Sequence, residues 1–508
     1  MAIKPPLWLF LLALATSWLI IGMAGFDGLY GQDSFHYLDC SRRVLTAPLQ
    51  ALQPGNCYWP VGYPALEALF IRLTGTAPFG AQLASTLTAA ALAPLTYWMA
   101  LESRLAGEQS RVQTGIAAGL ITALCGQVLL SSIVVMSDAA ALFWATLSAC
   151  LLLRWARGDA QDRCHILWLV GSAATLAIAA ITRWIYAGLL LPFGVFATVS
   201  VYRRQVVSFE STPGVPRAAL AARVIPPLLL AAATFCLIFL PELHVSQRSE
   251  SPALSHGWLV GWNPLNALRT SFDTADGHQH YRLPPAIVYA FPLVHPLYLS
   301  PLLTPFVFFG AWKSRHSRAL LLLGGWILTL YLYLSGVPFE NTRFPLAFFP
   351  PVAVLAAVGL WQLALALRLR PTRVWLLLLV ALGTAAPFSY RAISGLVRAK
   401  GGEVSAMRYL QAHVPADAVV VTFGLSATLK QYTRADVTDL FAQTPDTLRP
   451  IVCSGRRAYL YVERGNIESQ WPGKSPAINV HWLQDAIGMQ ALGSQDTWTL
   501  YRVRSCNS

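Results

Sequence analysis

Residues 166–202 indicate the fold class, and they read ILWLVGSAATLAIAAITRWIYAGLLLPFGVFATVSVY. A membrane-spanning helix needs about 20 mostly apolar residues. The stretch holds two such runs, 166–182 and 185–202, and Arg183 between them is its only charged residue. It therefore predicts two membrane helices that are joined by a short turn.

The whole chain has the composition of a multi-pass membrane protein. Its 508 residues are 55% hydrophobic and 12% charged, with a mean hydropathy of +0.49, whereas soluble domains carry about 25% charged residues. These values exclude an ordinary soluble enzyme, an intrinsically disordered chain and a small disulfide scaffold. We expect an all-α polytopic membrane protein with about eleven transmembrane helices. The expected spans are 7–26, 79–101, 114–136, 139–153, 166–182, 185–202, 224–242, 291–312, 319–337, 344–367 and 374–390.

The basic residues predict the orientation, because Lys and Arg are retained on the cytoplasmic side. With the N-terminus inside, twice as many Lys and Arg residues fall in the inside loops as in the outside loops. The run 7–26 follows Lys4 and lacks a small-residue cleavage site, so it is expected to stay as the first helix. An odd number of spans places the C-terminus outside. The net charge of +13 is thus mainly a topology signal, and no nucleic-acid partner is expected.

The outer side is expected to carry three regions long enough to fold. Region 27–78 begins with a helix-like stretch from Ser34 to Leu45, and region 243–290 should form short helices and turns. The tail is expected to be a small α/β domain, so the predicted domains are a membrane domain, 1–391, and an exoplasmic domain, 392–508. Its predicted strands are 417–423, 457–462 and 498–503, and its predicted helices are 407–413 and 480–487.

The predicted topology places the cysteines on different sides of the membrane. Cys40 and Cys57 share the first outer region, and Cys453 and Cys506 share the tail. An oxidising compartment would permit two disulfides, but distances cannot be taken from sequence, so free thiols remain the alternative. The chain has no Cys or His spacing typical of zinc, and no metal site is predicted.

Two acidic residues follow directly on predicted spans. If the segment after the first span is helical, Asp33, His36 and Tyr37 share one face. Asp33 could then accept a proton from an acceptor hydroxyl or amine; the alternative is a helix N-cap. Asp138 either caps the fourth span or faces Asp33 across an outer cavity.

Two isolated arginines lie on the outer side, where positive charge is disfavoured. Arg183 separates two spans, and Arg343 lies in Pro338-Phe339-Glu340-Asn341-Thr342-Arg343. A guanidinium group suits a phosphate at the membrane surface. The alternatives are snorkelling to lipid headgroups and a salt bridge between Arg343 and Glu340.

Other classes of chemistry lack support. No P-loop, nucleophile elbow, HExxH or dinucleotide fingerprint occurs in a suitable context, so nucleotide chemistry is not expected. The spans carry little charge at mid-membrane, which disfavours an ion-coupled transporter.

The order of these motifs resembles the GT-C superfamily of membrane glycosyltransferases, in particular glycosyltransferase family 39. That wider group includes protein O-mannosyltransferases and lipid A aminoarabinose transferases. The resemblance covers roughly residues 1–391. It is carried by Gly31-Gln32-Asp33-Ser34-Phe35-His36-Tyr37, Tyr58-Trp59-Pro60-Val61-Gly62-Tyr63-Pro64, Met136-Ser137-Asp138, Ile181-Thr182-Arg183 and Asn341-Thr342-Arg343-Phe344-Pro345.

The resemblance implies transfer of a sugar from a polyprenyl-phosphate-linked donor to an acceptor on the outer, periplasmic face, commonly with inversion. Asp33 and Asp138 would be catalytic, and Arg183 and Arg343 would bind the donor phosphate. Further candidates for substrate binding are His36, Tyr37, Tyr63 and Asn341.

One residue departs from the family pattern. Many relatives have an acidic residue directly after the first loop acid, where this chain has Ser34. No cofactor is evident, and the residues give no support to a divalent metal. The expected location is a bacterial inner membrane, with the N-terminus cytoplasmic and the C-terminus periplasmic.

Two other functions fit the composition. A transporter or flippase of a lipid-linked glycan would also need a lipid groove and arginines, and a membrane scaffold could bind a partner through its tail. The scarcity of charge at mid-membrane and the lack of a visible repeat favour the enzyme.

Overall fold

The computed structural model describes residues 4–48, 57–158, 165–210, 217–248, 261–274 and 276–506. The chain forms two compact units. The membrane unit comprises Met1–Leu29, Tyr37–Leu268 and Pro284–Ile393, and the C-terminal unit comprises Tyr30–His36, Arg269–Leu283 and Ser394–Ser508. The C-terminal unit is thus assembled from three separate stretches of the chain.

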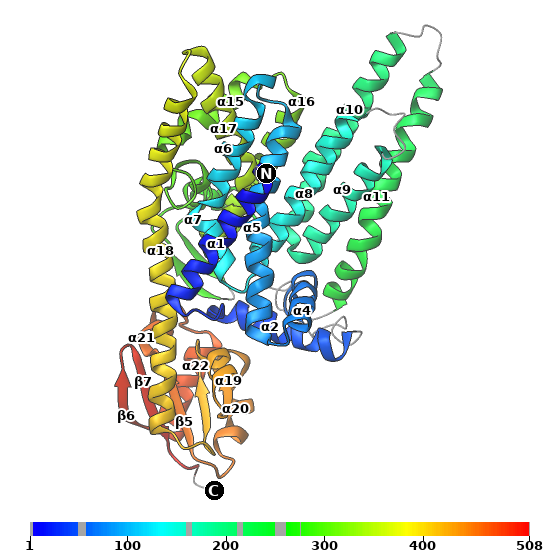
Figure 1. Ribbon diagram of the computed structural model, residues 1–508. Helices are drawn as coiled ribbons and strands as arrows, with labels where there is room; N and C mark the ends of the chain where they lie inside the picture. The colour runs from blue at the N-terminus through cyan, green and yellow to red at the C-terminus, as the bar shows by residue number, and fades with distance from the viewer. Residues whose placement is uncertain are drawn as a thin grey trace. The chain divides into compact units, whose positions relative to one another are not determined.

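The membrane unit is a bundle of helices (Figure 1). Its long helices are α1 (Pro5–Ala24), α5 (Ala77–Ser103), α8 (Ser137–Arg157), α9 (His165–Thr182), α10 (Leu190–Glu210), α11 (Arg217–Arg248), α16 (Arg318–Ser335), α17 (Phe349–Ala366) and α18 (Pro371–His413), whose last part belongs to the C-terminal unit. Its shorter helices are α2 (Gly31–Thr46), α4 (Gly62–Thr74), α6 (Arg111–Ala123), α7 (Gly126–Ile133), α13 (Pro285–Val288), α14 (Phe291–Val294) and α15 (Thr304–Lys313). Short 3-10 turns cover 108–110, 184–189, 264–268, 301–303 and 344–348.

Within the described ranges, eight helices are long and apolar enough to cross a membrane. A ninth span results if Glu108–Ala123 and Gly126–Ile133, which are bent by 55° relative to each other, are taken together. The prediction of an all-α multi-pass membrane protein is confirmed.

The predicted span 291–312 is not a single helix. The chain there forms α14, a 3-10 turn at Pro301–Leu303 and the ten-residue helix α15. Prolines stand at positions 292, 296, 301 and 305. Each removes a backbone donor and crowds the preceding turn, so the apolar run is divided into short pieces.

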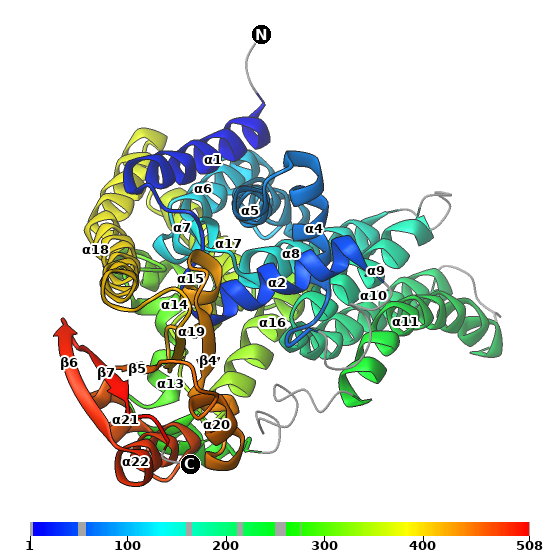
Figure 2. The ribbon, with the colours of Figure 1, turned by 90° about the horizontal axis from the view of Figure 1, so that it is seen from below.

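Helix α5 lies at the centre of the neighbouring helices, and Figure 2 shows it among α1, α4, α6 and α8. Small side chains at Ala81, Ala84, Ala89 and Ala93 are almost fully buried, which lets the neighbouring helices approach closely. The helix also carries buried polar residues near one end of the bundle.

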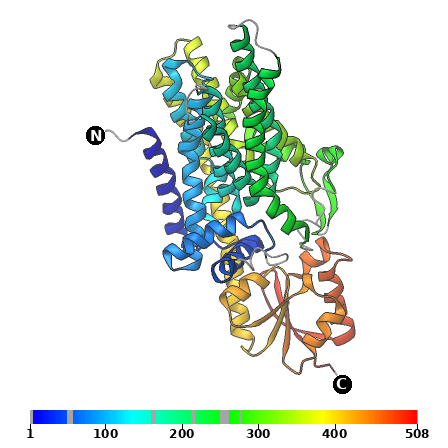
Figure 3. The ribbon, with the colours of Figure 1, turned by 90° about the vertical axis from the view of Figure 1, so that its right-hand side faces the viewer.

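The C-terminal unit contains a five-stranded sheet with the order β4-β3-β5-β7-β6 (Figure 3). Strands β4, β3 and β5 are parallel, and β7 pairs antiparallel with both β5 and β6. The strands are β3 (Val419–Thr422), β4 (Asp436–Asp439), β5 (Ala458–Val462), β6 (Met489–Gln495) and β7 (Trp498–Val503).

Alternating side chains pack on both faces of this sheet. Val419 and Val421 of β3 face α20 (Pro445–Val452), α21 (Arg464–Gln470) and α22 (Ser475–Trp482), and a π-helical turn at Leu483–Ile487 follows. Val420 faces the end of α18 and α19 (Ser426–Tyr432) on the other side. The hairpin of β1 (Ser271–Thr274) and β2 (Gly277–His280) joins the unit through an ion pair of 3.1 Å between Lys474 and Asp273.

The prediction of a small C-terminal α/β fold is confirmed, with the predicted strands at β3, β5 and β7. Strands β4 and β6 were not predicted. Both cysteine pairs that the sequence left open form disulfides, Cys40 with Cys57 and Cys453 with Cys506.

Candidate active site

Three of the predicted site residues meet at one end of the membrane bundle. Asp138 lies in the first turn of α8, Arg183 directly follows α9, and Arg343 precedes the 3-10 turn at 344–348. Arg183 Nη1 donates to Asp138 Oδ1, and Arg343 Nε lies 3.9 Å from Asp138 Oδ2. Two guanidinium groups thus share one carboxylate, and the cluster keeps a net positive charge.

The arginines are partly enclosed and stay accessible. Their side chains are 21% and 22% exposed, whereas that of Asp138 is only 6% exposed. The Phe344 ring lies against both guanidinium groups, with centroid distances of 4.8 Å to Arg183 Cζ and 5.7 Å to Arg343 Cζ. Each guanidinium has five N–H donors, and Arg343 Nη1 also lies 2.9 Å from Met136 Sδ.

Helix α5 fixes the segment that leads into Asp138. Gln82 Nε2 donates to the Ile133 carbonyl at 2.8 Å and to the Phe26 carbonyl at 3.0 Å. Thr86 Oγ1 donates to the Ser132 carbonyl at 2.9 Å, and the Met136 amide donates to Ser85 Oγ at 3.4 Å. The side chains of Gln82, Ser85 and Thr86 are buried. Their loss would therefore leave backbone N–H and C=O groups near Asp138 without hydrogen-bond partners.

The loop before Arg343 is fixed by tyrosines and by its own asparagine. Tyr289 Oη donates to the Phe339 carbonyl at 2.7 Å, and Tyr298 Oη donates to the Thr342 carbonyl. Asn341 Oδ1 accepts from the Arg343 amide at 3.1 Å. Asn341, which the sequence proposes as a substrate ligand, thus shapes the turn that presents Arg343.

The glycine of the Trp-Pro-Val-Gly-Tyr-Pro run explains how Arg183 is placed. A Cβ at Gly62 would lie 2.7 Å from the Ile181 carbonyl oxygen and 2.8 Å from Thr182 Oγ1. The start of α4 can therefore touch the end of α9, directly before Arg183, only because this residue has no side chain.

Helix α2 carries the remaining predicted residues. Tyr37 Oη lies 2.8 Å from Ser137 Oγ, so this phenol adjoins the Asp138 turn. Asp33 and His36 lie in the first turns of the same helix, in the stretch Tyr30–His36 that packs with the C-terminal unit. Asp33 and Tyr37 are four residues apart and share a helix face, and the approach of Asp33 to the arginines stays a prediction.

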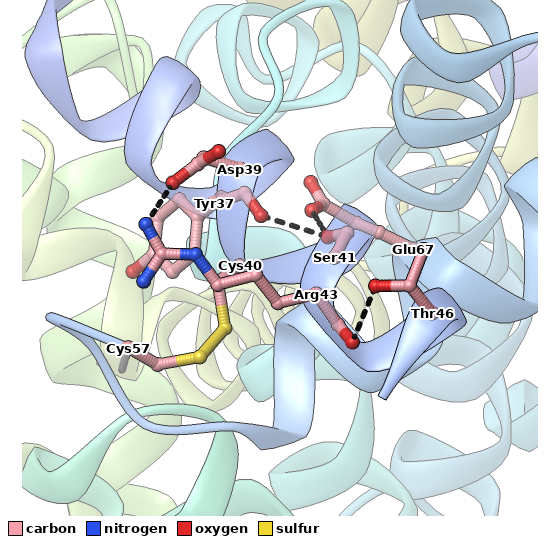
Figure 4. The surroundings of a disulfide bond; sticks show 8 residues. All are labelled: Tyr37, Asp39, Cys40, Ser41, Arg43, Thr46, Cys57 and Glu67. Carbon is pink, nitrogen blue, oxygen red and sulfur yellow. Dashed lines mark hydrogen bonds and ion pairs between the residues drawn. A yellow bond between two sulfur atoms is a disulfide. The ribbon is translucent and has the colours of Figure 1, made fainter. Parts of the chain in front are cut away.

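Tyr63 and Glu67 of α4 lie in the interior, and Figure 4 shows Glu67 beside Ser41 of α2. Both are 0% exposed. Tyr63 Oη bonds Ser85 Oγ, and Glu67 Oε2 bonds Ser41 Oγ. Burial raises the pKa of Glu67 to about 8. Sequence reasoning missed Glu67, although an acid inside the apolar run Tyr63-Pro64-Ala65-Leu66-Glu67-Ala68-Leu69-Phe70 was a usable signal.

Comparisons with known proteins bear on this arrangement. The family model of dolichyl-phosphate-mannose-protein mannosyltransferases matches residues 67–246, while no curated protein matches the sequence. The structure of ArnT from Cupriavidus metallidurans bound to undecaprenyl phosphate is similar over 97% of both chains, with a TM-score of 0.59 and 14% identity. The chain thus shares its fold with ArnT, and part of the chain matches the mannosyltransferase family model.

A second GT-C structure has a related architecture. The archaeal oligosaccharyltransferase AglB from Archaeoglobus fulgidus, in complex with an inhibitory peptide and a dolichol-phosphate, matches with a TM-score of 0.50 and 13% identity. The match covers 98% of this chain and 74% of AglB. The fold that the resemblance to GT-C enzymes implies is therefore confirmed.

Proposed function

We propose that this GT-C enzyme transfers a sugar from a polyprenyl-phosphate-linked donor to an acceptor on the outer face of the membrane. The observation that carries the proposal is the Asp138–Arg183–Arg343 cluster, whose net positive charge suits one phosphodiester. The ArnT and AglB structures contain undecaprenyl phosphate and a dolichol-phosphate, respectively, which supports a donor of this class.

The chemistry follows from the leaving group. The acceptor oxygen or nitrogen attacks the anomeric carbon of the sugar, and the bond between that carbon and the phosphate oxygen breaks. The polyprenyl phosphate leaves with the electron pair, and Arg183 and Arg343 stabilise its growing negative charge. A single displacement of this kind inverts the anomeric configuration.

In this mechanism the two acids have different tasks. Asp33 takes the proton of the acceptor hydroxyl or amine, the role that the resemblance to the family implies for it. Asp138 is engaged with two arginines, so its task is to hold them together at the donor phosphate. This role replaces that of a second base facing Asp33.

The outer location is inferred from charge and cysteines. Lys and Arg favour a cytoplasmic N-terminus, and both disulfides lie in segments that this orientation places outside. Disulfides persist in oxidising compartments such as the periplasm, so we infer a bacterial inner membrane with a periplasmic C-terminus.

The substitution Asp33→Asn tests the base. We expect it to lower sugar transfer by about 10²–10⁴-fold, because general-base assistance is lost while the side-chain size stays the same. The purified protein in nanodiscs would be given a panel of undecaprenyl-phosphate monosaccharides with a cell-envelope extract as acceptor. Released undecaprenyl phosphate would be measured by mass spectrometry.

The control is Asp39→Asn, which changes an exposed acid on the same helix that pairs with Arg43. It should leave the rate nearly unchanged, since exposed ion pairs contribute little. Full activity of the Asp33→Asn protein would remove Asp33 from the mechanism.

A further inference from the structure

Glu67 connects the two segments that carry the acids of the proposed mechanism. Ser41 of α2 bonds the Glu67 carboxyl of α4 (Figure 4). One turn earlier on α4, Tyr63 bonds Ser85 of α5, which accepts from the Met136 amide. A buried network thus runs from the helix of Asp33 and Tyr37 to the turn of Asp138.

Counting protons identifies the state of Glu67. Ser41 Oγ lies 2.7 Å from the Tyr37 carbonyl oxygen and also bonds Glu67 Oε2. A serine hydroxyl has one proton, and the carbonyl has none to give. If Ser41 donates to that carbonyl, the proton shared with Glu67 must come from Glu67. Both bonds are satisfied together only by the neutral acid.

The surroundings disfavour the ionised form. Glu67, Ser41 and Tyr63 are all 0% exposed, and no described ion pair involves Glu67. A titratable group that faces it is the phenol of Tyr63, whose ring lies edge to face against that of Tyr37 with centroids 5.0 Å apart. Asp138 and Arg183 belong to elements packed against α4 and pair with each other. A buried charge without a cation is strongly destabilised.

We propose that Glu67 is a positioning residue, which in its neutral form holds α2 against α4 and the Asp138 turn and on ionisation releases it. Its effect on sugar transfer rests on the proposed function. The neutral state predominates at neutral pH, because burial raises the pKa of Glu67 to about 8. One unit above this value about nine tenths of the groups are ionised, so we expect an almost tenfold loss of kcat/KM there.

The test compares the pH profile of the wild-type protein with that of Glu67→Gln. Glutamine keeps the size and a donor for Ser41 but does not titrate, so activity should persist at neutral pH and the decline near pH 8 should disappear. Glu340→Gln is the matched control, because burial raises the pKa of Glu340 to about 7; it should leave the decline near pH 8 in place. An unchanged decline in Glu67→Gln would overturn the proposal.

Hydrogen exchange tests the same idea without sugar transfer. Peptides from α2 should exchange faster in wild type than in Glu67→Gln about one unit above the pKa, and equally fast two units below it. Thermal unfolding adds a second readout. Native Glu67 keeps its proton up to about pH 8, whereas the unfolded chain loses it near pH 4.5. The wild-type melting temperature should therefore fall relative to Glu67→Gln across that range.

These readouts separate the two proposals. Absent sugar transfer in the wild-type protein, combined with the expected exchange and melting differences, would reject the proposed function and keep the role of Glu67 in holding α2. Equal exchange and parallel melting profiles in the two proteins would reject that role, whatever the enzyme does.

Discussion

Asp138 allows two arginines to lie in one site. Two guanidinium groups this near to each other repel, and the shared carboxylate offsets that repulsion at short range. Removing one member of a buried ionic group typically costs about 3–5 kcal/mol, because the remaining charges lose their partner. The acid therefore shapes the site even without touching the reacting sugar.

Both the positive charge and the two-pronged donor geometry of Arg343 should matter for use of the donor. We expect Arg343→Ala to lower kcat/KM for the donor by roughly 10–100-fold, since hydrogen bonds to charged groups contribute about 1.5–3 kcal/mol. Arg343→Lys should lose less, because it keeps the positive charge but not the two-pronged donor geometry. Initial rates at varied donor concentration measure both effects.

Arg43→Ala is the control, because Arg43 pairs with Asp39 at an exposed position. This substitution should have little effect on how the initial rate depends on donor concentration. Equal losses in Arg343→Ala and Arg343→Lys would argue against a bidentate contact with phosphate.

At the residue scale, the sequence singled out Asp138, Arg183 and Arg343 as candidates but did not indicate that they pair. Isolated arginines on the disfavoured side of a membrane are visible in sequence, and so is an acid after a span. The sharing of Asp138 by two arginines depends on where α8, α9 and the 344–348 turn meet, and no local pattern records that. Glu67 was missed because its partner Ser41 comes from another helix, α2.

At the element scale, the start of α4 sets the position of the end of α9. Gly62→Ala would push a methyl group into the Ile181 carbonyl and the Thr182 hydroxyl. Overpacking of this kind typically costs about 1–3 kcal/mol, and here it would displace Arg183. We expect a lower melting temperature and weaker use of the donor, measured by thermal unfolding and by initial rates.

Gly22→Ala is the matched control in α1, since a Cβ there would meet nothing within 4 Å. It should leave the melting temperature unchanged or slightly raised, because alanine favours helix. Equal behaviour of the two variants would show that the contact at Gly62 tolerates a side chain.

Helices and strands with a clear pattern of apolar residues were predictable from sequence. Elements whose apolar and polar residues are mixed were not. Long apolar runs identify α8, α9 and α17 directly. The run 291–312 is apolar enough but is broken by four prolines, whose effect outweighs hydropathy. Strand β4 reads Asp436-Val437-Thr438-Asp439 and β6 has many exposed side chains, so neither shows the buried pattern of β3 or β5.

At the scale of the whole molecule, the cysteines report on the orientation. We expect a membrane-impermeant maleimide to label Cys453 and Cys506 in intact spheroplasts only after reduction. Cys164 lies in a loop that the sequence places inside, so it should react only after the membrane is opened. Peptide mapping by mass spectrometry identifies the labelled residues, and labelling of Cys164 alone in intact spheroplasts would reverse the proposed orientation.

The composition of the C-terminal unit could not be predicted from sequence. The tail was recognised because its strands are buried and follow a long membrane helix. The unit also takes up 30–36 and the β1–β2 hairpin, which come from distant regions and join it through contacts such as Lys474 with Asp273. Such long-range contacts have no signature in one sequence.

The single excess positive charge of the Asp138–Arg183–Arg343 cluster has a kinetic consequence under the proposed chemistry. A donor phosphodiester carries one negative charge, whereas the spent carrier is a phosphomonoester with up to two. The spent lipid should then be held more tightly than the fresh one. Turnover would be governed by carrier departure, and accumulated carrier would inhibit the enzyme by competing with the donor.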